Sequence, residues 1–287
     1  MPRLSSEITV DAHQHFWKIG LFRNPSRDPS VPPLYRDYLP DDLKPLIDNA
    51  AVNRTIVVQC RQMPEEGVAE TRWHLRLADV YSFIAGVVGW VDLRNPMVGR
   101  TLDELQRHPK IKAIRHPVEF ESTDDWLARE ETIRGFRELA RRGLAYDLLV
   151  RTRHLRHIPN LFDRIPDLRM VVEHIAKPDI RTGAIDTWAA AMERVSLIPS
   201  LYCKLSGMIT EADPRHWKSA DLKPYVQKVI QCFGYDRVMY GSDWPVCNLA
   251  GSYQQQLDAL VEALGPMTNE QCAKVFGRNA REFYRLD

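Results

Sequence analysis

The sequence predicts a single α/β domain, a (β/α)8 barrel of the TIM type. Eight short apolar runs recur along the chain, most of them separated by segments with helical spacing of apolar residues. No long linker or internal repeat divides the 287 residues, of which 44% are hydrophobic, enough for one large core. We therefore expect residues 1–287 to form one barrel.

Each predicted strand is rich in aliphatic or aromatic residues. The runs are, in order, EITVDAHQHF from Glu7, RTIVVQC from Arg54, FIAGVVGWVDL from Phe83, KIKAIRHP from Lys110, LAYDLLV from Leu144, LRMVVEHIAKP from Leu168, SLYCKLSG from Ser200 and DRVMYGSDWP from Asp236. Alternation with helices favours parallel strands. The alternative, an open doubly wound sheet, normally has a Gly-rich turn after its first strand, where this chain has HQHFWKIG.

Helices are predicted between these runs. TLDELQRH, ETIRGFRELARRG and DTWAAAMERV carry apolar residues at helical spacing. The last helix, within MTNEQCAKVFGRNAREFYRL, begins with Thr268 and Gln271 at capping-box spacing. The proline-rich stretch 18–43 predicts a long first βα loop, at the mouth where barrel enzymes build their sites.

Charge and cysteine content narrow the class of protein. The chain has 39 basic and 38 acidic residues, a net charge of +1, so no strong field favours nucleic acid or membrane as a partner. The N-terminus has no apolar signal segment, and no run approaches transmembrane length. Five scattered cysteines without a CxxC motif fit a reduced compartment and argue against a cysteine-built zinc site. We expect a cytoplasmic protein.

The stretch VDAHQHFW, residues 10–17, places two histidines one residue apart at the end of the first predicted strand. Side chains at i and i+2 of a strand share a face, so His13 and His15 are expected to project together, with Asp11 on the same face. Two adjacent imidazoles suit a metal ion or a carbonyl group that must be polarised. A surface pair in a loop is the alternative for this motif alone.

Two further strands end in polar residues. His174 ends the sixth run and Asp243 ends the eighth, as His13 and His15 end the first. In a barrel the carboxyl ends of the strands meet at one rim, where catalytic groups collect. Singly, His174 could cap a strand and Asp243 could form a turn before Pro245. Their joint occurrence favours a site.

The motifs DAHQHFW, EHIAKP and YGSDWP, in this order, resemble the amidohydrolase superfamily. More narrowly they resemble its sugar-lactone branch, closest to the L-fuconolactonase and L-rhamnonolactonase group. The likeness continues through RDYLPDDL, IRHP, DLLV, KLSG and FGRNAREFYRL, and so covers nearly the whole chain. The resemblance implies a catalytic core of His13, His15, His174 and Asp243, which is also the ligand set for any bound metal.

The chain departs from the two-metal members of this superfamily. Those members add a bridging lysine or glutamate on strand four and a histidine on strand five. Here strand four offers Arg115 and His116, and strand five offers Asp147. The resemblance therefore implies one divalent metal ion or none, with zinc favoured by the histidine and carboxylate ligands.

The implied reaction is hydrolysis of a sugar-acid lactone, an L-fuconolactone or a related aldonolactone, to the free acid. Asp243 would activate water as general base, and the histidine cluster would polarise the carbonyl. Three alternatives stay open: a decarboxylase of the aminocarboxymuconate type, a lactonase for pyrone dicarboxylate, and a non-catalytic barrel that binds sugar acids. The decarboxylase is disfavoured by the absence of a Gly-rich sequence after His174, and pyrone dicarboxylate should need several convergent arginines.

Several residues are predicted to contact a small-molecule sugar lactone. Trp17 offers a flat face for stacking, and Tyr35 in the first loop is placed to close over the ligand. Hydrogen bonds are expected from Arg115, His116, Lys204 and His154, with ion pairs inside the barrel as the alternative for Arg115 and Lys204. His74, His108 and His216, on or beside helices, are expected to be solvated. A homo-oligomer is possible.

Overall fold

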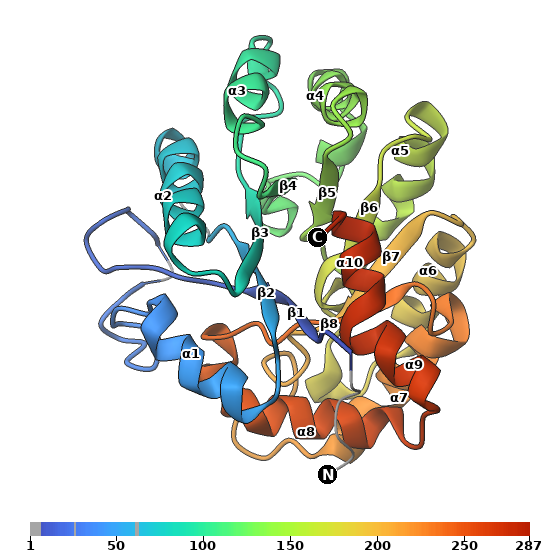
Figure 1. Cartoon of the computed structure of the whole chain (residues 1–287). Helices are drawn as coiled ribbons and strands as arrows, with labels where there is room; N and C mark the ends of the chain where they lie inside the picture. The colour runs from blue at the N-terminus through green and yellow to red at the C-terminus, as the bar shows by residue number, and fades with distance from the viewer. Residues whose placement is uncertain (1–6, 26, 61–62) are drawn as a thin grey trace.

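The computed structural model describes residues 7–25, 27–60 and 63–287, which form a (β/α)8 barrel (Figure 1). Eight parallel strands pair in sequence order from β1 to β8. They are β1 (Val10–Gln14), β2 (Arg54–Val58), β3 (Ile84–Gly89), β4 (Ile111–His116), β5 (Ala145–Leu148), β6 (Met170–Val172), β7 (Leu201–Leu205) and β8 (Val238–Tyr240). The predicted fold class and all eight predicted strands are confirmed.

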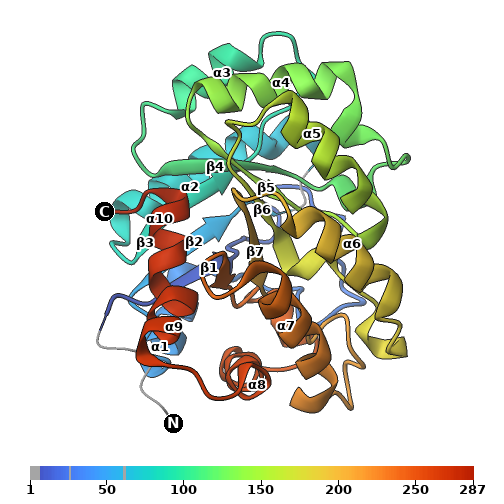
Figure 2. The ribbon, with the colours of Figure 1, turned by 90° about the vertical axis from the view of Figure 1, so that its right-hand side faces the viewer.

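Helices α1 to α8 surround the strands (Figures 1 and 2). They are α1 (Pro40–Asn49), α2 (Gly67–Val80), α3 (Val98–Leu105), α4 (Glu130–Arg141), α5 (Ile158–Arg164), α6 (Asp186–Ser196), α7 (Ser219–Phe233) and α8 (Tyr253–Leu264). Short 3-10 segments follow several strands. None of the helices in the described part of the chain is long and apolar enough to cross a membrane.

The C-terminal helix lies across one end of the barrel (Figures 1 and 2). It runs through α9 (Asn269–Ala273), a π-helical turn (Lys274–Arg278) and α10 (Asn279–Tyr284). The predicted capping box is present, because Thr268 N donates to Gln271 Oε1 and Gln271 N donates to Thr268 Oγ1. Apolar side chains of α10 join one buried cluster with inward-facing strand residues: Val10, Ala12, Ile56, Val58, Val88, Ala113, Ala145, Val171, Met239, Ala280, Phe283 and Tyr284.

The first βα loop is long, as its composition predicts, but it ends earlier than residue 43. Helix α1 already begins at Pro40, whose fixed φ suits a first helical position. The Asp42 carboxylate accepts a hydrogen bond from Leu39 N at 2.9 Å and so fixes this start. The connection therefore runs from His15 to Leu39.

Two expectations about orientation are wrong. Asp11 does not share the face of His13 and His15, because the register of β1 against β2 shifts between Asp11 and Gln14. Its carboxylate instead accepts hydrogen bonds from Tyr253 Oη on α8 and from Ser242 N. His74 is not solvated: it lies on the inward side of α2, fully buried, with Nε2 3.2 Å from the carbonyl oxygen of Phe16.

Candidate active site

The barrel closes where β1 meets the segment after β8, and this seam assembles half of the site. His15 N donates to the carbonyl of Trp244 at 2.7 Å, and Asp243 N donates to the carbonyl of His13 at 2.8 Å. These two backbone hydrogen bonds fix Asp243 beside both histidines, although 228 residues separate it from His15. His174 reaches the same place from the end of β6.

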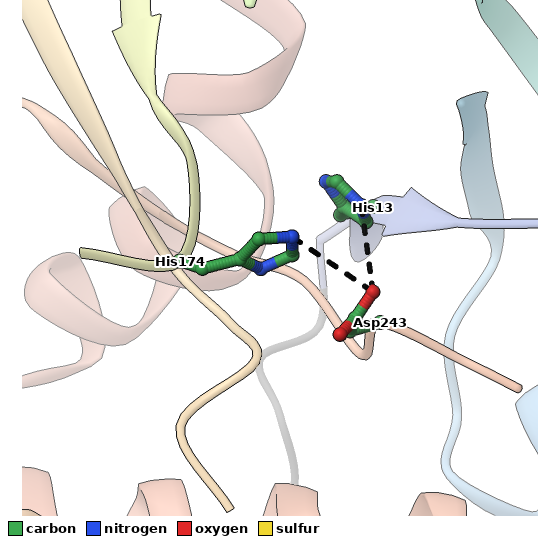
Figure 3. Close-up of side chains that lie close together, drawn as sticks. All are labelled: His13, His174 and Asp243. Atoms are coloured by element: carbon green, nitrogen blue, oxygen red, sulfur yellow. Dashed lines mark ion pairs between the residues drawn. The ribbon is translucent and has the colours of Figure 1, made fainter. Parts of the chain in front are cut away.

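The four side chains converge on one oxygen atom. Nε2 of His15, His13 and His174 lies 3.3, 3.5 and 3.9 Å from Asp243 Oδ1. Figure 3 shows His13 and His174 each reaching this carboxylate, from β1 and from the turn after β6. All four residues are buried, none with more than 5% of its surface exposed. The structure therefore brings together every residue of the predicted catalytic core.

The opposite ring nitrogen of each histidine is held by a neighbouring group. Nδ1 lies near Val58 O for His15 (2.8 Å), near Ser206 Oγ for His174 (2.9 Å) and near Glu173 Oε1 for His13 (3.1 Å). A carbonyl oxygen only accepts, so Nδ1 of His15 must donate to Val58 O, whereas Nδ1 of His13 lies between the acceptor Glu173 Oε1 and the donor Lys204 Nζ, which is 3.3 Å away. Nε2 of both rings faces Asp243.

Two glycines allow the histidines to sit this close to the backbone. A Cβ atom on Gly207 would lie 2.5 Å from Nδ1 of His174, and one on Gly241 would lie 2.6 Å from Cβ of His13. Gly207 also has a φ of +63°, a conformation that other residues rarely adopt. A side chain at either position would displace a histidine of the site.

Left-handed backbone occurs at two places in the site, in the turn after β6 and at Asp243 after β8. Four consecutive residues from His174 to Lys177 have φ between 47° and 61°, and Asp243 has φ of 56°. Such conformations cost energy in residues other than glycine and persist only where the surroundings enforce them. Here the turn after β6 is held by the hydrogen bond from Trp188 Nε1 to the carbonyl of Ile175 at 2.6 Å. This strained backbone directs the side chains of His174 and Asp243 toward each other.

A set of four buried charges lies between His13 and α10, and we name it the inner cluster. Its members are Arg115 on β4, Asp147 on β5, Glu173 directly after β6 and Lys204 on β7. Their side chains are between 0 and 4% exposed. Tyr284 of α10 donates to Asp147 Oδ2 at 2.7 Å, which ties the C-terminal helix to this cluster.

The inner cluster is closely paired and contacts the site at His13. Lys204 Nζ lies 2.6 Å from Asp147 Oδ2, 3.3 Å from Glu173 Oε1 and 3.3 Å from Nδ1 of His13. Arg115 donates to Glu173 Oε2 at 2.8 Å and also to the carbonyl of Gln59. The two cations and two carboxylates thus balance each other's charge in a space without solvent.

Burial and these neighbours set the protonation of the site. Burial lowers the pKa of His13 and His15, and lowers that of His174 to about 4, so the imidazoles are neutral at neutral pH. Burial raises the pKa of Asp243, but attraction to His174 and His13 in their protonated forms and the hydrogen bond from His15 hold that pKa below its ordinary value. The site therefore combines neutral histidines with an ionised carboxylate.

This donor set fits one divalent cation. His13, His174 and Asp243 offer ligand atoms within 4.8 Å of one another, and His15 Nε2 lies 3.3 Å from the same Asp243 oxygen. Neutral imidazoles and one carboxylate are ligands that zinc and similar ions prefer. The fixed Nδ1 atoms hold each ring in the orientation that a ligand needs.

The residues predicted to contact substrate from the first loop lie together. Trp17 and Tyr35 both line a cavity of about 280 Å³ between this loop and α2. Tyr35 is 42% exposed and free to meet a ligand. Trp17 is 5% exposed, and the guanidinium of Arg27 lies 3.4 Å from its ring centroid, so stacking of a sugar on that face requires Arg27 to move. Both assignments stay predictions.

The other predicted contacts are engaged within the protein. Arg115 and Lys204 form the ion pairs that were the alternative for them. His116 stacks on Trp126 with ring centroids 4.2 Å apart, and both of its ring nitrogens have partners. Nδ1 of His154 accepts from Arg151 N at 3.0 Å. Contact between these four residues and a substrate stays a prediction.

Sequence reasoning did not single out Glu173 or Ser206, although each holds a histidine of the core. Glu173 was visible as the residue before His174, yet alternation along a strand places neighbours on opposite faces. The left-handed turn brings both into the barrel. Ser206 carries no motif of its own, and only the packing of β7 against the β6 turn shows its contact with His174.

Comparison with known proteins gives a consistent result. The family model described as Amidohydrolase matches residues 10–286. An L-fucono-1,5-lactonase of Burkholderia ambifaria is 39% identical, over 97% of this chain and 96% of that protein. An L-fucono-1,5-lactonase of Burkholderia multivorans is 34% identical over the same shares of the two chains.

A solved structure extends this similarity to three dimensions. A crystal structure of an amidohydrolase from Burkholderia multivorans with bound zinc superposes with a TM-score of 0.90. It is 33% identical, and the match covers 98% of this chain and 100% of that one. The barrel and its length are therefore shared along the whole chain.

Proposed function

This chain belongs to the amidohydrolase family, and from that premise we propose that it hydrolyses a sugar-acid lactone to the free aldonic acid. The two L-fucono-1,5-lactonases matched over nearly their full length support a lactonase acting on sugar lactones. Within that class we propose L-fucono-1,5-lactone or a related aldonolactone as substrate. The observation that carries this proposal is the convergence of three imidazoles on the Asp243 carboxylate.

Lactone hydrolysis needs a base for the attacking water, a polarised carbonyl and a proton for the leaving alkoxide. Asp243 is ionised and buried, and no hydrogen bond from a described residue engages its Oδ2 atom. We assign it to take the proton from water and later to return it to the ring oxygen that leaves. An alkoxide leaves more readily than an amine, which favours a lactone over an amide as substrate.

The histidines have a positioning and electrostatic role in this proposal. His13, His15 and His174 would hold a divalent ion, for which we propose zinc, together with Asp243. When bound, such an ion supplies Lewis-acid stabilisation of negative charge on the carbonyl oxygen. The contacts at Nδ1 keep the rings fixed while charge develops, so little reorganisation is needed during the reaction.

Pairing of Arg115 disfavours pyrone dicarboxylate as the substrate. Recognition of a second carboxylate calls for an arginine with free donors. Arg115 is the predicted strand-end arginine, and its guanidinium already donates to Glu173 and to the carbonyl of Gln59. A neutral, hydroxylated lactone makes no such demand.

The test is a substrate panel measured as kcat/KM. It contains L-fucono-, L-galactono- and D-arabinono-lactones, pyrone dicarboxylate and simple amides, with acid release followed by a pH dye and spontaneous ring opening subtracted. Carbon dioxide release from carboxymuconate-type acids is measured in parallel. We expect the sugar lactones to be hydrolysed best. Sugar lactones at background beside good turnover of any other class would refute the proposal.

A further inference from the structure

Four charged side chains outside the site follow four consecutive strands. Glu119 follows β4, Arg151 follows β5, Lys177 follows β6 and Glu211 follows β7. In a barrel the segments after consecutive strands meet at the carboxyl end, the end that carries the candidate active site. We name these four residues the rim cluster. None of them belongs to the residues predicted from the sequence.

The rim cluster is a ring of alternating charge. Lys177 Nζ lies 2.7 Å from Glu119 Oε1, and Arg151 Nε lies 3.3 Å from Glu119 Oε2. The ring closes through Glu211, whose carboxylate is 3.5 Å from Arg151 Nη1 and 4.0 Å from Lys177 Nζ. The contact from Lys177 to Glu119 Oε1 is short, whereas Arg151 has only a long hydrogen bond to Glu211, and Glu119 Oε2 has no hydrogen-bond partner among the described residues, so donors and acceptors of the cluster are incompletely satisfied.

The exposed fractions of the side chains divide the rim cluster into one buried residue and three accessible ones. The side chain of Glu119 is only 2% exposed, whereas Arg151, Lys177 and Glu211 are 40, 19 and 18% exposed. Glu119 thus anchors Lys177 and lies within ion-pair distance of Arg151. The other three present two hydrogen-bond donors and one acceptor to solvent.

Lys177 connects the rim cluster to the catalytic core. It ends the left-handed turn that begins at His174, and its backbone N donates to the carbonyl of His174 at 2.8 Å. The turn that carries His174 into the catalytic core therefore also carries Lys177 into the rim cluster.

We propose that the rim cluster recognises the hydroxyl groups of the sugar ring, an inference that rests on the proposed function. Arg151 and Lys177 donate to ring hydroxyls and Glu211 accepts from one. A hydroxylated neutral ring both donates and accepts, which matches a cluster of zero net charge. An anionic ring would face the two carboxylates of the cluster, Glu119 and Glu211. The rim cluster thus determines specificity for polyols.

The test compares two lactones of the same ring size. L-Fucono-1,5-lactone carries ring hydroxyls, and δ-valerolactone carries none. For Arg151→Gln and Glu211→Gln we expect kcat/KM for the sugar lactone to fall by about 10- to 100-fold, as for loss of one hydrogen bond to a charged group. The value for δ-valerolactone should change less than about twofold, because that ring makes no such bond.

Controls separate this inference from the proposed function. Arg141→Gln, which removes an exposed ion pair with Glu138 on α4, should leave both substrates unchanged. Arg151→Lys, which keeps the charge, should recover part of the sugar-lactone rate and guards against a variant that fails to fold. Equal loss for both lactones, or no loss for either, overturns the rim inference while wild-type sugar-lactone hydrolysis stands. A wild-type enzyme inactive on all sugar lactones overturns the proposed function as well.

Discussion

The inner cluster and the rim cluster contain the same charges in different surroundings. Each has two cations and two carboxylates: Arg115, Lys204, Asp147 and Glu173 inside, and Arg151, Lys177, Glu119 and Glu211 at the rim. Inner side chains are at most 4% exposed, whereas rim side chains reach 40%. Breaking an ion pair between buried charges costs much free energy, whereas a half-exposed charge exchanges its partner at little cost.

This difference assigns the two clusters different tasks. Burial opposes ionisation of Glu173, but Arg115, His13 and Lys204 hold its pKa well below the ordinary value, so it stays an acceptor for His13. The inner cluster thereby fixes one ring of the core. The rim cluster can exchange an ion-pair contact for a substrate hydroxyl. Variants inside should affect every substrate alike, and variants at the rim should affect only hydroxylated ones.

Substitution of Asp243 is expected to have the largest effect on activity. Asp243→Asn keeps the shape but removes the proposed base, so kcat should fall by about 10²–10⁴-fold for both L-fucono-1,5-lactone and δ-valerolactone. Circular dichroism should show an unchanged fold. A folded Asp243→Asn protein with near wild-type turnover would refute the assigned base.

Removal of a bound metal ion is expected to have the next largest effect on activity. We expect at most one tightly bound divalent ion per chain, because β4 and β5 lack the bridging and second-site ligands, and Arg115 and Asp147, which stand on these strands, are already paired within the inner cluster. Its removal by a chelator should cost several kcal/mol of transition-state stabilisation for both lactones, and zinc should restore the rate. Elemental analysis before and after chelation measures this. Two equivalents that leave together with activity would contradict the expected single site.

Within the inner cluster, Glu173→Gln should weaken both folding and catalysis. It leaves Arg115 and Lys204 with one carboxylate instead of two, and breaking a buried pair typically costs about 3–5 kcal/mol. Urea unfolding measures that loss, with Asp48→Asn in the exposed ion pair with Lys44 on α1 as a control expected below about 1 kcal/mol. The kcat/KM values for the two lactones should fall by a common factor. Selective loss of the sugar lactone would place Glu173 in substrate recognition instead.

Much of this arrangement was predictable from the sequence, and the reasons for the rest are physical. His13, His15, His174 and Asp243 were found because each follows an apolar strand, and strand ends meet in a barrel. Asp11 was misplaced because a register shift in β1 leaves no trace in the alternation of residues. The rim residues sit in loops, where charged side chains normally are solvated, and only the folded βα segments show that they meet.

The smallest expected effect tests how far the inner cluster depends on the C-terminal helix. Tyr284 Oη donates to the same Asp147 oxygen that Lys204 contacts, and Asp147 Oδ1 has no hydrogen-bond partner among the described residues. Tyr284→Phe keeps the buried ring and removes one hydrogen bond to a carboxylate, so the free energy of unfolding should fall by about 1.5–3 kcal/mol.

Lys204 still pairs with Asp147 in that variant, and therefore kcat/KM for both lactones should change less than about threefold, the factor that ~0.6 kcal/mol represents. Tyr202→Phe is the matched control, since Tyr202 packs beside Phe283 of α10 and its hydroxyl makes no hydrogen bond to a described residue. It should leave stability nearly unchanged. A strong loss of activity at unchanged stability in Tyr284→Phe would mean that the inner cluster transmits the position of α10 to His13. The inner cluster would then not be a fixed support for the site, and the contrast drawn with the rim cluster would be wrong.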